Sequence, residues 1–160
     1  MCFCMANKFK KVKKIILPRE DEQVEKFINY VMKDGKKSVA RRVFSDTMKE
    51  IRDNWHMNPK IVLRTAIENA SPTIMVKSAR VWGSVYQVPV EVKQQRKFFF
   101  ACKWILDAAR TKKWRPMFKK LAEEVLAAYS WQWYAVKKRE EAQKMAEANK
   151  AFAYMSKYVH

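Results

Sequence analysis

Glycine is scarce in this chain of 160 residues, which contains only Gly35 and Gly83. A loop that binds phosphate through its backbone needs several closely spaced glycines, so the sequence excludes a glycine-rich nucleotide site. Histidine is equally rare: we expect His56 to lie in a turn between two helices, His160 is the last residue, and no candidate bases or ligands cluster around either. We therefore predict no enzymatic activity, no cofactor and no metal.

Cysteine is present in an odd and small number, as Cys2, Cys4 and Cys102. Cys2 and Cys4 are too close together for the paired cysteines of a zinc site, and three residues cannot form a disulfide framework. We interpret them as free thiols in a reducing compartment. Cys102 falls on a helical apolar stripe and is expected to be buried and inert.

Long apolar runs are also missing, since no stretch approaches the roughly 20 residues that span a bilayer. The N-terminus is too short and polar for a secretory signal and lacks the arginine and serine enrichment of a transit peptide. The expected helices have neutral or mixed polar faces, which makes a membrane the least favoured anionic partner.

Acidic residues are few, with 16 Asp and Glu against 34 Lys and Arg, and the net charge is +18. A folded protein this basic repels itself unless a polyanion neutralises it. Hydrophobic residues nevertheless make up 49% of the chain, enough for one domain with a real core. RNA and DNA are therefore the favoured partners.

The basic charge is concentrated first in an N-terminal arm, residues 1–19, which has no acid. Such a run next to a folded domain is typical of a segment that binds a polyanion, although a plain solvated tail is the alternative. Its positive residues are Lys8, Lys10, Lys11, Lys13, Lys14 and Arg19.

Residues 20–160 are predicted to form a mainly helical domain of six helices. Pro18 and Gly35 bound the first, and Asn58 followed by Pro59 starts the third. Pro116 opens the fifth, and the sixth runs from about Tyr134 to Phe152 with a thin apolar stripe. The predicted apolar stripes are Ala40, Val43, Phe44, Thr47, Met48 and Ile51; Leu63, Ala66, Ile67 and Ala70; Phe98, Ala101, Cys102, Ile105 and Ala109; and Ala142, Met145 and Phe152.

The β pattern is confined to residues 73–92, where Tyr86, Val88, Val90 and Val92 repeat with period two. Gly83 and Ser84 mark a turn, so we predict a two-stranded antiparallel ribbon. Such a ribbon is marginally stable alone and needs a surface to lie against. The tip and base of the ribbon contain a single acid, Glu91. Their cations are Lys77, Arg80, Lys93, Arg96 and Lys97.

A second cationic patch lies where the fourth helix meets the fifth, because no acid occurs between Asp107 and Glu123. Trp114 lies inside it. A stacking platform for a base is one role, but a core or interface position is the favoured one. The patch includes Arg110, Lys112, Lys113, Arg115, Lys119 and Lys120.

Three motifs occur together and in order: DGKKS at 34–38, VKSARVWGSVYQVPVEV at 76–92 and AVKKREEAQKMAEANKAF at 135–152. On these residues the chain resembles the small-subunit ribosomal protein seven family, in its bacterial and organellar form, from about Ile15 to Phe152. The resemblance implies a helical domain with a protruding β-ribbon. It also implies binding to ribosomal RNA of the small-subunit head, a part in organising head assembly, and a position near exit-site tRNA, the mRNA exit path and the number-eleven small-subunit protein.

Carried onto this sequence, the resemblance implies RNA contacts from the arm lysines and from a set of residues in the domain. Those in the domain are Lys36, Lys37, Lys77, Arg80, Trp82, Arg96, Lys97, Arg110, Lys112, Lys113, Lys137, Lys138 and Arg139. Arg80 and Arg96 are expected to depend most on geometry, because guanidinium groups bind phosphate bidentately.

The chain departs from the family at the ribbon tip, where Ala79 and Trp82 replace an arginine and a glycine, and at Trp131 and Trp133, which replace a glycine-containing loop. The low glycine content favours a mitochondrial ribosome, with a bacterial or plastid origin as the alternative. The rival function is an architectural DNA-binding protein with a basic β-arm.

Overall fold

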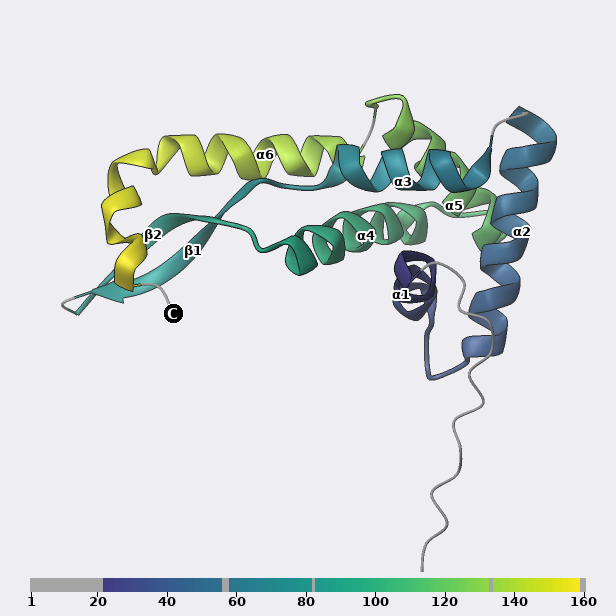
Figure 1. The fold of residues 1–160 in the computed structure, drawn as a ribbon, viewed down its shortest axis with the longest axis horizontal. Helices are drawn as coiled ribbons and strands as arrows, with labels where there is room; N and C mark the ends of the chain where they lie inside the picture. Colours follow the sequence, from purple (N-terminus) through teal and green to yellow (C-terminus); the bar gives the residue numbers. More distant parts are fainter. Residues whose placement is uncertain (1–21, 56–57, 82, 133, 159–160) are drawn as a thin grey trace, which may run out of the picture.

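The computed structural model describes residues 22–55, 58–81, 83–132 and 134–158. Within these ranges it is mainly helical with one antiparallel hairpin, so the predicted fold class is confirmed (Figure 1). The basic arm, the side chains of Trp82 and Trp133, and both histidines lie outside the described residues. The elements are α1 (Glu22–Val31), α2 (Lys37–Trp55), α3 (Pro59–Ala70), β1 (Ile74–Val81), β2 (Ser84–Glu91), α4 (Gln94–Thr111), α5 (Met117–Tyr129), α6 (Tyr134–Ala148) and the 3-10 helix η1 (Lys150–Tyr158).

The helical body is built around α5, which packs against α2, α3 and α4. In Figure 1, α2 stands across the ends of α3 and α4, and α1 is seen nearly end-on beside them. The apolar stripes of α2, α3 and α4 point inward as predicted, because helical spacing places them on one face of each helix. Side chains that are fully buried in this core include Phe27, Ile51, Ile105, Leu121 and Val125.

Helix boundaries follow local chemistry at some sites and not at others. Asn58 caps α3 as predicted: its side-chain oxygen accepts a hydrogen bond from the backbone N–H of Lys60 at 3.2 Å. The prediction that Gly35 ends the first helix was wrong. That helix ends at Val31, and Gly35 instead follows Asp34 in a turn whose φ angles of 53° and 72° are left-handed and cannot continue a helix.

The β-ribbon pairs Ile74 with Glu91 at its base and Val81 with Ser84 at its tip. Ser84 therefore belongs to the strand and not to the turn, which contains Gly83 at φ 87°. Because side chains alternate along a strand, the two faces differ. One face carries the buried residues Ala79, Val81 and Val88, and the other carries Ser78, Arg80, Val85 and Gln87, which are all exposed.

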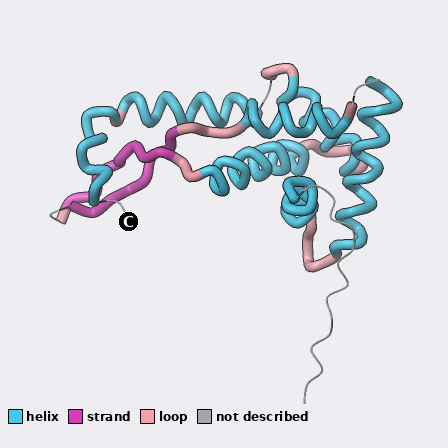
Figure 2. Tube along the Cα trace, in the orientation of Figure 1, coloured by secondary structure: helices cyan, strands magenta, loops and turns pink. Residues whose placement is uncertain are grey.

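The surface that supports the ribbon is the chain's own C-terminal segment. α6 packs on β1 and η1 packs on β2, and Figure 2 shows the segment turning back across the strands. The rings of Phe152 and Tyr86 are 5.5 Å apart, and Met155 packs against the buried cluster around Val88. In a 3-10 helix, residues three apart share a face, so Phe152 and Met155 point at the ribbon together.

The predicted single helix from Tyr134 to Phe152 is thus wrong in its last turn. α6 ends at Ala148, and the backbone N–H of Phe152 donates to the carbonyl of Asn149, three residues back. The predicted stripe is also wrong at Met145, which is 59% exposed, whereas Val136 and Ala146 are buried. The physical reason is that α6 first lies on α3 and α4 and then on the ribbon, so the buried side shifts along its length.

Substituting Val88 by Ala should loosen the ribbon without unfolding the body. The change removes about two methylene equivalents from a fully buried site, a loss of roughly 2 kcal/mol in local stability, and the cluster around Val88 is separate from the helical core. Amide hydrogen exchange should accelerate in 74–91 and 150–157 but not in α3 or α5. Val85→Ala, on the exposed face, is the matched control; equal exchange in both variants would contradict the packing described here.

Candidate nucleic-acid interface

The exposed face of the ribbon carries a cation, Arg80, that forms no ion pair within the described residues. Arg80 lies opposite Val85 on this face, and both are exposed. Lys77 also has an exposed side chain, but its position in the register puts it on the same side as Val88, which α6 and η1 cover. The structure therefore places these two predicted contacts on opposite faces of the ribbon.

The base of the ribbon contains a hollow of about 480 Å³. Its cationic lining comes from three elements: Lys77 on β1, Lys93 in the connection to α4, and Arg96 in the first turn of α4, with Glu91 as the one acid. Lys93 occupies the cap position of α4 without a side-chain hydrogen bond, and the first turn contains no acid. Free backbone N–H groups at a helix start favour anions. Lys97, which is half-buried, follows in the same turn.

In the DGKKS motif, the two lysines have different surroundings. Lys36 is exposed, whereas Lys37 forms an ion pair with Glu25 at 3.0 Å, and Arg41 pairs with the same carboxylate at 2.9 Å. Hydrogen bonds from Lys37 and Arg41 lower the pKa of the Glu25 carboxyl below its ordinary value. Lys37 is thus partly engaged in joining α1 to α2.

The α4–α5 loop, residues 112–116, is tied to α5 by ion pairs. The Lys112 ammonium lies 2.7 Å from the buried Glu124 and 3.2 Å from Glu123, and Arg115 also pairs with Glu123. Burial alone would lower the pKa of Lys112 and raise that of Glu123. Hydrogen bonds to Glu124 and Glu123 outweigh burial and raise the pKa of Lys112, and hydrogen bonds from Lys112 and Arg115 lower the pKa of Glu123. Within the described part of the chain, Lys113 is exposed and forms no ion pair.

Arg139, whose RNA contact stays a prediction, is half-buried at the junction of α6 with α3. Its guanidinium donates to the carbonyl of Asn69 at 2.9 Å and lies 4.7 Å from the ring of Trp131. Asn69 itself is buried and donates to the carbonyls of Ala128 and Tyr129, both at 3.1 Å. Asn69 was not predicted as a structural contact, although a single amide beside the apolar stripe of α3 could have indicated a buried hydrogen-bonding role.

The other predicted cations differ in whether they contact a group within the protein. Lys138 pairs with Glu141 at 2.7 Å and lies over the Tyr134 ring, while Lys137 is exposed. Arg110 donates to the carbonyl of Tyr30 at 3.4 Å. The predicted contacts Lys8, Lys10, Lys11, Lys13, Lys14 and Trp82 lie outside the described residues.

Trp114 was expected at a core or interface position, with a stacking platform as the other role. Its side chain is 97% exposed, and its φ of 70° is left-handed. The core part of that prediction is therefore wrong, whereas an interface role and a stacking role both stay predictions.

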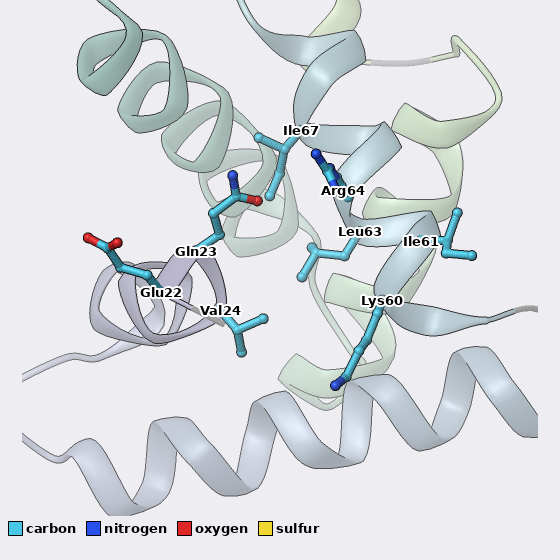
Figure 3. A pocket seen from close by; sticks show the side chains of 8 residues that line it. All are labelled: Glu22, Gln23, Val24, Lys60, Ile61, Leu63, Arg64 and Ile67. Atoms are coloured by element: carbon cyan, nitrogen blue, oxygen red, sulfur yellow. The ribbon is translucent and has the colours of Figure 1, made fainter. Parts of the chain in front are cut away.

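Another hollow lies between the start of α1 and α3. In Figure 3, Gln23 and Val24 lie toward Leu63, Arg64 and other side chains of α3 across a space of about 450 Å³, whereas the Glu22 carboxylate points away from α3. Among the residues that the structure describes, no three His, Cys, Asp or Glu side chains come together as a metal site would require. Burial raises the pKa of the Cys102 thiol to about 12, so it stays protonated.

The described helices include none with the length and apolar character needed to cross a bilayer.

Comparison with known proteins identifies relatives over nearly the whole chain. A family model described as ribosomal protein S7p/S5e matches residues 6–150. The small ribosomal subunit protein uS7 of Thermotoga maritima is 47% identical over 134 residues, which cover 84% of this chain and 86% of that protein. The uS7 proteins of Alkalilimnicola ehrlichii, 47% identical with 83% and 85% covered, and Dictyoglomus thermophilum, 46% identical with 82% and 84% covered, are similarly related.

Replacing Lys112 by Met should destabilise the protein because it leaves Glu124 buried without a counter-charge. We expect a loss of about 2–3 kcal/mol in the free energy of unfolding, below the value for a fully buried pair since Lys112 keeps part of its surface in solvent. Adding Glu124→Gln to this variant should restore most of the lost free energy of unfolding, because it removes the unpaired charge. Lys113→Met, the exposed neighbour, should change stability little in chemical denaturation, and an equal loss in both single variants would refute the structural role of Lys112.

Proposed function

Since this chain belongs to the S7p/S5e family of ribosomal proteins, we propose that it is a structural constituent of the small ribosomal subunit that binds ribosomal RNA through its β-ribbon and the base of that ribbon. The proposal draws on the similarity to the small-subunit uS7 proteins and on the net charge of +18. A polyanion is the partner that lets so basic a chain remain folded without strong self-repulsion.

One observation carries the proposed RNA interface. The exposed face of the ribbon and the hollow at its base form a run of cations that includes Arg80, Lys93 and Arg96, and none of these three pairs with an acid in the described residues. Phosphates are the groups that such cations and an uncapped helix start would bind. The apolar side of the ribbon is already covered by α6 and η1, so RNA would meet the other side.

The remaining predicted contacts form two groups under this proposal. Direct phosphate contacts are proposed for the exposed cations that lack ion pairs in the described part of the chain, together with Lys77, Lys97 and the arm lysines. Among the predicted contacts, these exposed and unpaired cations are Lys36, Arg80, Arg96, Lys113 and Lys137. Those with internal partners, Lys37, Arg110, Lys112, Lys138 and Arg139, would position the loops and helices that carry the first group.

We further propose that the RNA belongs to the head of the subunit, that the protein helps to organise head assembly, and that the ribbon and C-terminal segment approach exit-site tRNA, the mRNA path and the number-eleven protein. The ribbon, α6 and η1 form one projection from the body, which suits contact with ligands beyond the RNA that binds the body (Figure 1). The named relatives are bacterial and give no support to a mitochondrial origin, so we propose the subunit without an organelle.

A competition assay tests this function against the architectural DNA-binding alternative. A transcript of the small-subunit RNA head domain should displace the protein from random duplex DNA at physiological salt, and the protein should sediment with small subunits. Equal affinity for both nucleic acids would favour the alternative. Salt sensitivity alone does not separate them, because both would release counterions.

Substituting Arg80 and Arg96 by Gln should weaken binding to that transcript by about tenfold for each arginine that contacts a phosphate, or roughly 1.4 kcal/mol. The slope of log affinity against log salt should also become shallower by about 0.7–0.9 per contact. Lysine variants should recover part of the affinity, since they keep the charge but not the bidentate geometry.

Arg64→Gln provides the matched control, because Arg64 is an exposed arginine that already pairs with Glu68 on the body. Binding that falls equally in this variant and in Arg80→Gln would show that net charge, and not the ribbon, determines affinity.

A further inference from the structure

Trp114 is almost completely exposed, at 97%. A large aromatic side chain gains much when it is removed from water, so a ring this exposed is available to a partner that could cover it. Its left-handed backbone, with φ 70°, is unfavourable for a residue other than glycine. The surrounding loop must therefore hold it there.

Ion pairs and a proline restrain the backbone of this loop. Lys112 and Arg115, two residues before and one after Trp114, are both tied to α5 through Glu123 and Glu124. Pro116 then restricts the backbone at the start of α5, with φ −64°. A ring held outward in this way loses little freedom on binding, which favours affinity.

The charge around the ring points to the chemistry of its partner. Lys113, which is exposed, and the tied Arg115 flank it in the sequence, Lys119 follows in the first turn of α5, and that turn contains no acid. That helix start also lacks a side-chain cap, so its backbone adds positive potential. An exposed ring among cations matches a nucleotide, in which a flat base adjoins a phosphate.

We propose that Trp114 is a stacking site for an unpaired base of the small-subunit ribosomal RNA, with Lys113 beside the adjoining phosphate and the tied Arg115 holding the loop. The proposal rests on the RNA-binding function proposed above, in which Lys113 is already a phosphate contact, and adds a base contact next to it. α4 separates this loop from the ribbon base by 18 residues, or about 27 Å of helix, so one nucleotide cannot reach both. A protein partner that buries the ring is the competing outcome.

Two substitutions separate stacking from simple apolar contact. Trp114→Phe keeps an aromatic face, whereas Trp114→Leu keeps apolar bulk without one. Binding to the head-domain transcript should remain near the wild-type value for the Phe variant. It should fall about 5- to 100-fold for the Leu variant, within the range measured for loss of one base stack, and the salt dependence should not change. Lys113→Gln should instead make the salt slope shallower.

Cross-linking locates the contact directly. A head-domain transcript that carries 4-thiouridine should cross-link on irradiation to the tryptic peptide Trp114–Lys119, which stays intact because Arg115 precedes Pro116. The Leu variant should lose this cross-link and keep those at the ribbon. Its thermal unfolding should match wild type, since the ring is exposed.

The two proposals can fail separately. If the wild-type protein does not prefer the transcript over duplex DNA, the RNA-binding function falls and this contact falls with it. If the wild-type protein binds and the Leu variant binds equally well without altered cross-linking, only the stacking site is refuted. Leu variants that bind RNA normally but fail to enter the small subunit would assign Trp114 to a protein partner and overturn the proposal.

Discussion

The covering of the ribbon's apolar face by the C-terminal segment is the contact on which the rest of the functional surface depends. Two strands whose buried side chains are only Ala79, Val81 and Val88 within the described residues cannot hold their register against solvent alone. Phe152 and Met155 provide the missing side of this small core. Once that side is closed, the face with Arg80 is the one left to meet a ligand. Packing thus decides the direction in which the charge points.

A second constraint is that many cations form ion pairs or hydrogen bonds within the protein, which reduces the charge they offer to a partner. Lys112 neutralises two carboxylates, one of them buried, and Arg139 joins α6 to the end of α3. Paired cations attract phosphate less, because part of their charge is already compensated nearby. The surface that can bind a polyanion is therefore narrower than a net charge of +18 suggests. The described cations proposed to contact RNA lie at the ribbon and its base, in the α4–α5 loop, before α2 at Lys36 and on α6 at Lys137.

Helical periodicity and capping chemistry predicted most of the body correctly. The stripes containing Ile51, Ala66 and Ile105 are buried, and Asn58 caps its helix, because these features depend on residues only a few positions apart. Predictions failed where distant parts meet. Met145 was assigned to a buried stripe and lies in solvent, and the helix through Phe152 changes to a 3-10 helix where it reaches the ribbon. Neither outcome is encoded in local spacing.

The candidate interface shows the same division. Residue types and their order along the chain determined by themselves that the protein is basic, helical and equipped with a β-ribbon, and three motifs indicated its family. Only the tertiary structure decided which cations stay available, since an ion pair depends on distances of 3–4 Å between elements far apart in sequence. It also decided that Trp114 lies in solvent. Composition cannot distinguish a buried tryptophan from an exposed one, because exposure depends on what the fold places above the ring.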